Sequence, residues 1–109
     1  MNTKTPIRTA LVTGSGRNIG RAVVLALAEQ GCNVIINGSS NRAACEAVAG
    51  EAQDLGAKAL VAMGDVGDPD AARQICRSGA TEFGRIDILV NNAAVRPLKP
   101  FLETTDDDW

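Results

Sequence analysis

The sequence contains neither tyrosine nor histidine, and aromatic residues make up only 3% of its 109 residues. Histidine is the most frequent proton-transfer group in enzymes, and tyrosine is another side chain used for this purpose. Without them the chain lacks two of the side chains that enzymes use for proton transfer.

Cysteine is scarce as well, and the spacing of the cysteines matches neither a metal site nor a redox motif. Cys32, Cys45 and Cys76 are odd in number, lie in apolar or helical stretches and show no C-x-x-C spacing. This pattern predicts reduced, mostly packed thiols, and we expect no metal site. A catalytic cysteine is the functional alternative, but the chain has no histidine that could activate its thiol.

The chain also lacks a strong charge of either sign and any long apolar run. Its formal net charge is −2, so no face can carry the concentrated positive charge that nucleic acids or anionic membranes attract. No apolar run approaches transmembrane length, and the opening Met1 to Pro6 is too short and polar for a signal peptide. We expect a cytoplasmic protein with no nucleic-acid or membrane partner.

What is present is an alternation of short apolar runs with helical patterns. Strands are expected over residues 9–12, 33–37, 57–63 and 87–90, and helices over residues 19–30, 42–55 and 69–83, with another helix beginning near Thr105. Helix signals support these limits. They are the stops Gly31, Gly56 and Gly84, the N-cap Asn41, and the pair Asp68 and Pro69 at a helix start.

This alternation with short connections predicts an α/β fold, a doubly wound parallel sheet of the Rossmann type with helices on both faces. The chain is short enough for one domain at most, and its 45% apolar residues suffice for a core. The usual strand order would be 3-2-1-4. A ligand would then bind at the carboxyl ends of strands one and four, where the order reverses.

The stretch from Thr13 to Gly20 lies where the first strand becomes the first helix, whose apolar periodicity runs through Ile19, Val23, Ala26 and Leu27. Free backbone N–H groups and the positive end of the helix dipole can bind a pyrophosphate there. We expect one glycine for the turn, one for close approach of the ligand and one for close helix packing: Gly14, Gly16 and Gly20 in that order. The alternative is a glycine-rich connection that binds nothing.

The spacing of this stretch resembles the Thr-Gly-x-x-x-Gly-x-Gly turn of the short-chain dehydrogenases/reductases, with Asn18 in place of the middle glycine. Asparagine tolerates left-handed backbone conformations better than other non-glycine residues. Gly64-Asp65-Val66 is similar to the family's adenine-contacting segment, and Asn91-Asn92-Ala93-Ala94 to its Asn-Asn-Ala-Gly beside the nicotinamide ribose. Asn91 and Asn92 could instead be mainly structural.

Together, these motifs predict a set of cofactor-binding residues, which are Gly14, Ser15, Gly16, Arg17, Asn18, Ile19, Gly20, Ser39, Asp65, Val66, Asn91, Asn92 and Ala93. An NAD-selective site usually carries an acid about 20 residues beyond the glycines. Gly38 stands at the matching position, followed by Ser39, Ser40, Asn41 and Arg42. With Arg17 as a further cation, this favours NADP over NAD; solvated arginines without a ligand are the alternative.

The resemblance implies hydride transfer between NADP(H) and a small carbonyl or alcohol substrate, by a Ser-Tyr-x-x-x-Lys group and in a homo-oligomer. No such group is present: there is no tyrosine, and the lysines are Lys4, Lys58 and Lys99. The resemblance therefore implies that no catalytic residue lies within residues 1–109, and that they are the cofactor-binding portion, truncated before the catalytic half and inactive alone.

Within the family, the chain resembles the 3-oxoacyl carrier-protein reductase-like members. Two alternatives remain open. One is a free-standing nucleotide-binding or regulatory module without catalysis. The other is a different doubly wound protein, such as an adenosylmethionine-binding methyltransferase, against which the paired asparagines speak.

Overall fold

The computed structural model describes residues 6–92, and four strands alternate with three helices along them. In chain order the elements are β1 (Thr9–Val12), α1 (Asn18–Glu29), β2 (Asn33–Ile36), α2 (Arg42–Asp54), β3 (Ala59–Val61), α3 (Pro69–Phe83) and β4 (Ile88–Val90). Each predicted element within this range is present. The helix expected near Thr105 and the predicted site residue Ala93 lie outside the described residues.

The four strands form one parallel sheet in the order β3-β2-β1-β4, which confirms the predicted topology. On one side of β1, Ala10 is paired with Val34 of β2, and on the other side it is paired with Ile88 of β4. Because β1 lies between β2 and β4, its carboxyl end adjoins the ends of both. The order therefore reverses at β1, as expected for a doubly wound sheet.

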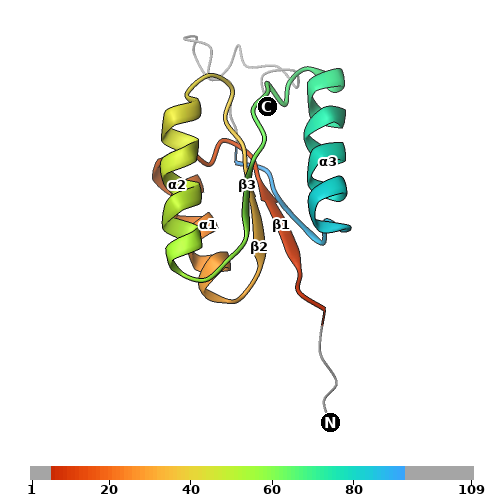
Figure 1. Cartoon of the computed structure of the whole chain (residues 1–109). Helices are drawn as coiled ribbons and strands as arrows, with labels where there is room; N and C mark the ends of the chain where they lie inside the picture. The colour runs from red at the N-terminus through yellow and green to blue at the C-terminus, as the bar shows by residue number, and fades with distance from the viewer. Residues whose placement is uncertain (1–5, 93–109) are drawn as a thin grey trace, which may run out of the picture.

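Helices cover both faces of the sheet, with α1 and α2 on one side and α3 on the other (Figure 1). Successive side chains of a strand point to opposite faces. On β1, Val12 packs with Val24 of α1 and Val48 of α2, whereas Leu11 packs with Ile75 of α3. This explains why all four residues of β1 are buried, as in parallel sheets covered on both faces.

The predicted helix limits are set by the expected caps. The Asn41 side chain accepts a hydrogen bond from the Ala44 amide at 3.0 Å, and Asp68 caps α3 by accepting from the Asp70 amide at 3.3 Å. Gly84 ends α3 with a left-handed φ of 78°. Local side-chain and backbone chemistry therefore decides where α2 and α3 begin and where α3 ends.

The third strand is shorter than the predicted span 57–63. At its start, the Ala57 amide donates to the Ala52 carbonyl at 3.1 Å, so Ala57 closes α2 instead of joining the sheet. At its end, the Ala62 carbonyl accepts from the side-chain amide of Asn37 at 3.0 Å. A side chain thus takes the place of a strand partner, and β2 also ends one residue early, at Ile36.

The apolar face of α1 differs in part from the expected one. Its buried residues are Gly20, Val24 and Ala28, four residues apart, whereas Ile19 is 72% exposed and Ala26 is also exposed. The helix is confirmed, and of its predicted apolar positions Val23 and Leu27 are half-buried and pack against the core, whereas Ile19 and Ala26 do not. Small Gly20 and Ala28 form the contact face because they let α1 lie close to the sheet.

Candidate functional site

The glycine turn between β1 and α1 has the backbone conformation predicted for it. Gly14 has φ 59° and Asn18 has φ 57°, so both lie in the left-handed region. Asn18 is the only non-glycine residue with positive φ among residues 6–92. Asparagine thus supplies the conformation for which glycine is usually needed, and its presence in the motif does not disrupt the turn.

Gly20 lies where no larger residue fits. A Cβ atom at this position would lie 2.5 Å from the Gly14 carbonyl oxygen, 2.8 Å from the Ser15 Cα and 2.8 Å from the side-chain nitrogen of Asn92. Two of these neighbours are backbone atoms that cannot rotate away. The close packing expected of Gly20 is therefore confirmed, and it brings the start of α1 against the turn itself.

Gly16 lies against the first turn of α2. A Cβ atom on Gly16 would lie 3.1 Å from the Cys45 Sγ and 3.5 Å from the Ala44 Cβ. The small size of Gly16 thus has a packing role within the protein. Its predicted role in ligand approach stays a prediction.

The amino end of α1 has no side-chain cap among the described residues, and its first turn contains no acid. By contrast, Asn41 caps α2 and Asp68 caps α3. The N-cap residue of α1 is Arg17, which is exposed and extended, with φ −168°. The first N–H groups of a helix have no intrahelical acceptor, so this end offers donors to an anion.

Sequence reasoning missed Asn37, the residue that organises the site. Asn37 directly follows β2 and is 1% exposed. Its Oδ1 accepts from the Gly14 amide at 3.1 Å, and its Nδ2 donates to the carbonyls of Ala62 at 3.0 Å and Gly64 at 3.1 Å. One amide group therefore joins the turns that follow β1, β2 and β3. The available signal was a polar residue at the end of a buried apolar strand.

Ser15, a predicted cofactor contact, faces into the protein. Its Oγ donates to the Val12 carbonyl at 2.7 Å and accepts from the Asn37 amide at 2.9 Å, while its own amide donates to the Asn37 carbonyl at 2.7 Å. The side chain is fully buried. These bonds hold the glycine turn to the end of β2.

The end of β4 is bound to the same turn. The Asn92 amide donates to the Thr13 Oγ1 at 2.9 Å, and the Asn92 side chain donates to the Gly14 carbonyl at 3.1 Å. Asn91 is exposed, and its Oδ1 lies 3.4 Å from the Thr13 hydroxyl. The structural role considered for the paired asparagines is thus present, and it places both of them beside the glycine turn.

The segment after β3 reaches this region through Gly64, whose amide donates to the Gly38 carbonyl at 2.9 Å. Asp65 is exposed, and its Oδ1 accepts from the Gly67 amide at 2.8 Å. Val66 is half-buried and packs against the Leu11 cluster on the α3 side. The carboxylate of Asp65 is therefore accessible at the carboxyl edge of the sheet.

The residues that were expected to choose the cofactor lie on the loop between β2 and α2. Ser39 is exposed, and Gly38 is partly exposed. The Arg42 guanidinium forms an ion pair with Glu46 at 3.3 Å, one turn further along α2. Arg17 has no such carboxylate partner among residues 6–92 and is the freer cation.

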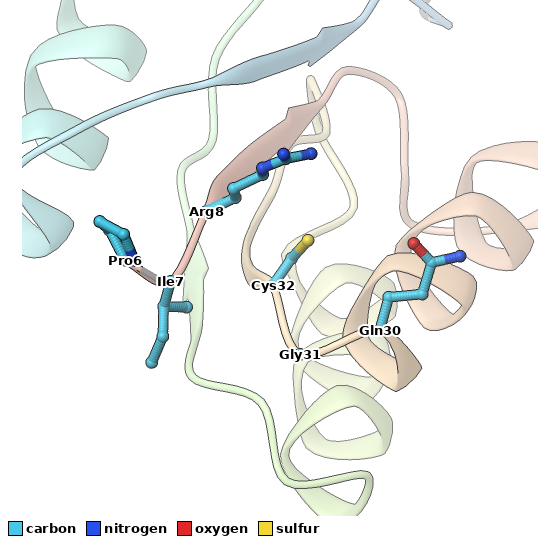
Figure 2. A pocket seen from close by; sticks show the side chains of 6 residues that line it. All are labelled: Pro6, Ile7, Arg8, Gln30, Gly31 and Cys32. Carbon is cyan, nitrogen blue, oxygen red and sulfur yellow. The ribbon is translucent and has the colours of Figure 1, made fainter. Parts of the chain in front are cut away.

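A cavity of about 280 Å³ lies at the opposite end of the sheet. Figure 2 shows its lining around the start of β1 and the turn after α1, formed by Pro6, Ile7, Arg8, Gln30, Gly31 and Cys32. The glycine turn follows the carboxyl end of β1, whereas this cavity adjoins its amino end. It is therefore separate from the candidate nucleotide site.

Within residues 6–92, no three or more His, Cys, Asp or Glu side chains gather as a metal ion would require. In the same part of the chain, no helix has the length and apolar character needed to cross a membrane.

The chain as a whole has counterparts among known proteins. The sequence model of the short chain dehydrogenase family matches residues 8–109. The chain belongs to this family. Short-chain dehydrogenases are oxidoreductases that bind NAD(P), so the methyltransferase alternative is wrong.

Two relatives and one solved structure illustrate the similarity of this chain to other members of the family. Versicolorin reductase stcU of Emericella nidulans is 36% identical over 102 residues, which cover 94% of this chain and 39% of that protein. The 3-oxoacyl-acyl-carrier-protein reductase FabG of Staphylococcus aureus is 33% identical over 102 residues, which cover 94% of this chain and 42% of that protein. A dehydrogenase/reductase from Sinorhizobium meliloti superposes with a TM-score of 0.81 at 35% identity, over 93% of this chain and 40% of that one. The chain thus spans about two fifths of the length of these relatives.

Proposed function

We propose that this chain is the NADP(H)-binding portion of an enzyme that transfers hydride between NADP(H) and a small carbonyl or alcohol substrate. The observation that carries the proposal is the uncapped amino end of α1 behind a turn in which Gly20 has no room for a Cβ. A helix end with free donors and no acid favours a pyrophosphate. The names of the relatives, reductases and a dehydrogenase/reductase, agree with this reaction class.

In this proposal the amides of Gly16 and of the start of α1, from Arg17 to Gly20, hold the pyrophosphate, while Gly14 and Ser15, whose amides donate to Asn37, shape the turn around it. Ser15 contributes through its place in the turn, since its Oγ is bonded to Val12 and Asn37. The exposed side chain of Ile19 offers an apolar contact next to these donors. When bound, the cofactor would supply or accept the hydride.

The remaining predicted contacts take the two ends of the dinucleotide. The exposed carboxylate of Asp65 can accept from the exocyclic amine of adenine, and Val66 supplies apolar surface beside it. Asn91 and Asn92, with Ala93 following them, would lie at the nicotinamide end because they adjoin the glycine turn from the β4 side.

The preference for NADP over NAD is part of the proposal. The loop between β2 and α2 contains no acid that could accept a hydrogen bond from the ribose hydroxyl and repel a 2′-phosphate. Ser39 is an exposed hydroxyl on that loop, and Arg17 is an exposed cation without a carboxylate partner among the described residues. Both features suit a phosphate monoester.

We further propose that residues 1–109 alone do not catalyse the reaction. The sequence offers no tyrosine or histidine as a proton donor to the carbonyl oxygen, and such assistance is worth about 10²–10⁴-fold. The complete enzyme is proposed to be a cytoplasmic homo-oligomer that acts on a small molecule and needs neither a nucleic acid nor a membrane.

A free-standing nucleotide-binding module is the other candidate, since the sequence contains no tyrosine or histidine to transfer a proton. Titration of the purified 109-residue protein with NADPH and NADH, followed by calorimetry or cofactor fluorescence, tests the binding. We expect NADPH to bind more tightly and carbonyl reduction to stay at background across a ketone panel. Equal or NADH-favouring affinity would refute the cofactor assignment, and robust turnover would refute the assignment as a binding portion.

The reading frame beyond Trp109 separates the two candidates. An in-frame Ser and Tyr-x-x-x-Lys group would support the dehydrogenase. A stop without such a group would support the module.

A further inference from the structure

The side chain of Cys45 fills the space between the glycine turn and the loop that follows β2. Cys45 lies in the first turn of α2 and is 1% exposed. Its Sγ lies 3.1 Å from where a Cβ of Gly16 would be and 2.6 Å from where a Cβ of Gly38 would be. One thiol therefore lies against both segments that the proposed function assigns to the cofactor.

Any side chain at position 38 would have to displace the thiol of Cys45. A separation of 2.6 Å is far below the contact distance of real Cβ atoms, whereas the next neighbours of this position, Met63 Cε at 3.6 Å and Met63 Sδ at 3.9 Å, are ordinary contacts. Gly38 is not among the glycines with positive φ, so its backbone conformation does not itself demand glycine. Cys45 therefore disfavours a larger residue at position 38, since its thiol is buried and lies against Gly16 as well.

Position 38 is the place where an acid would select NAD. It directly follows Asn37 at the carboxyl end of β2, about 20 residues beyond the glycine turn. We propose that Cys45 is a specificity-determining residue, because its side chain excludes an acid from position 38 and so maintains the preference for NADP. The inference rests on the proposed function and adds to it a buried residue that would act on cofactor choice through position 38.

The chemistry of the thiol suits this spacer role. Burial raises the pKa of Cys45, with the nearby Arg42 opposing the rise and Glu46 adding to it. The thiol is therefore kept protonated and uncharged near neutral pH. A neutral thiol fits between two glycines without drawing a counterion or water into the contact.

The test compares Gly38→Asp, Cys45→Ala and the double variant Gly38→Asp/Cys45→Ala in the full chain, by urea unfolding and by titration with NADPH and NADH. We expect Gly38→Asp alone to be destabilised and Cys45→Ala alone to keep the NADPH preference. The double variant should regain stability and shift the ratio of NADPH to NADH affinity toward NADH by about tenfold or more. The reason is that the new carboxylate would accept a hydrogen bond from the ribose hydroxyl of NADH and would repel the 2′-phosphate of NADPH.

A milder pair keeps the test decisive if the acidic variants do not fold. Gly38→Ala adds only the Cβ, so it should be destabilised alone and rescued by Cys45→Ala. Gly50→Ala is the matched control, because a Cβ on Gly50 meets nothing within 4 Å. Equal stability of Gly38→Ala with and without Cys45→Ala would overturn the exclusion.

The outcomes separate this inference from the proposed function. If the unmodified chain binds NADPH and the folded double variant keeps the same cofactor ratio, the specificity role of Cys45 is refuted while the binding function stands. If Gly38→Asp alone is stable and prefers NADH, Cys45 excludes nothing. If the unmodified chain binds neither cofactor, the proposed function fails, and the role of Cys45 in specificity fails with it.

Discussion

The side-chain oxygen of Asn37 accepts a hydrogen bond from the Gly14 amide at 3.1 Å, so the end of β2 fixes the turn that follows β1. The same side chain donates to the carbonyls of Ala62 and Gly64 after β3. All hydrogen-bonding groups of this buried amide are thereby used. The shape of the candidate site depends on one residue that lies outside every recognisable motif.

Asn37→Ala should therefore be strongly destabilising. The Gly14 amide and the two carbonyls after β3 would lose their partner in a buried place, and we expect a loss of about 3 kcal/mol in the free energy of unfolding. Urea unfolding measures this loss. Asn41→Ala is the control, because it removes an exposed helix cap and should cost about 1 kcal/mol. A cost for Asn37→Ala no larger than that of the control would contradict the proposed role of Asn37.

Gly20→Ala should disrupt the junction between the turn and α1. The new Cβ would meet the Gly14 carbonyl at 2.5 Å and the Ser15 Cα at 2.8 Å. Neither backbone atom can yield without moving the turn, so we expect a loss of about 3 kcal/mol or more, and loss of dinucleotide binding. Gly50→Ala, in the middle of α2 with open space around it, should instead gain about 0.5–1 kcal/mol. Thermal unfolding of both variants gives the comparison, and equal effects would argue against tight packing at Gly20.

The elements were predictable because their signals are local. β1 has its predicted bounds, and α3 begins at Pro69 after the Asp68 cap. The role of Asn37 was not predictable, since its partners Gly14 and Gly64 lie 23 and 27 residues away in the sequence. A polar residue at the end of an apolar run looks the same whether it is buried or exposed. Only the packed sheet decides between the two.

Two of the glycines also differ in whether the reason for them could be predicted from the sequence. At Gly14 the left-handed φ could be expected from the turn motif. At Gly38 the requirement comes from the Sγ of Cys45, a residue seven positions further on and in another element. The sequence shows that position 38 carries no acid. The physical reason for this can be found only from the structure, which places α2 against the loop.

Arg17→Ala should weaken the preference for NADPH. Arg17 is the exposed cation at the uncapped end of α1, and a guanidinium bonded to a 2′-phosphate is worth about a tenfold difference in affinity. NADH affinity should change little. Arg77→Ala, which removes an exposed arginine from α3, is the matched control for net charge. Calorimetric titration with both cofactors measures the ratio, and an unchanged ratio in Arg17→Ala would remove Arg17 from the site.

The stability of the sheet should fall in acid because of Asp87. Its carboxylate accepts from the Thr9 amide at 2.8 Å and from Arg85, and the Arg85 contact first, then the Thr9 bond, lowers the pKa of Asp87. A lowered folded-state pKa means that the carboxylate stabilises the fold above the unfolded pKa of about 3.9 and that this contribution is lost as pH falls through the folded value. The pH range in which Asp87 makes the stability fall therefore lies below about pH 4.

Asp87→Asn should flatten this part of the pH dependence, because asparagine does not titrate. Chemical unfolding between about pH 5 and pH 2.5 measures the slope. Asp54→Asn at the exposed end of α2 is the control and should leave the slope of the unmodified chain in place. An identical acid dependence in Asp87→Asn would show that other carboxylates are responsible.

The outer side of β4 should make the 109-residue chain prone to self-association. Within the described residues β4 pairs only with β1, and it forms one edge of the sheet. Leu89 on this strand is 63% exposed, although its neighbour Leu11 in the register is buried. An unpaired edge beside an exposed apolar side chain recruits further chains.

Leu89→Lys should reduce this association without unfolding the sheet, because the side chain packs little in the monomer and an edge lysine opposes strand pairing. Light scattering over a concentration series gives the mass, and hydrogen exchange compares the protection of β4 with that of β1. We expect growing mass and a poorly protected β4 in the unmodified chain, and a lower mass in the variant. Leu55→Lys is the control for the added charge, because Leu55 is also an exposed leucine but lies at the end of α2. A monomer at high concentration with β4 as protected as β1 would mean that other residues cover this edge, and that the fold of this chain extends beyond the four-stranded sheet.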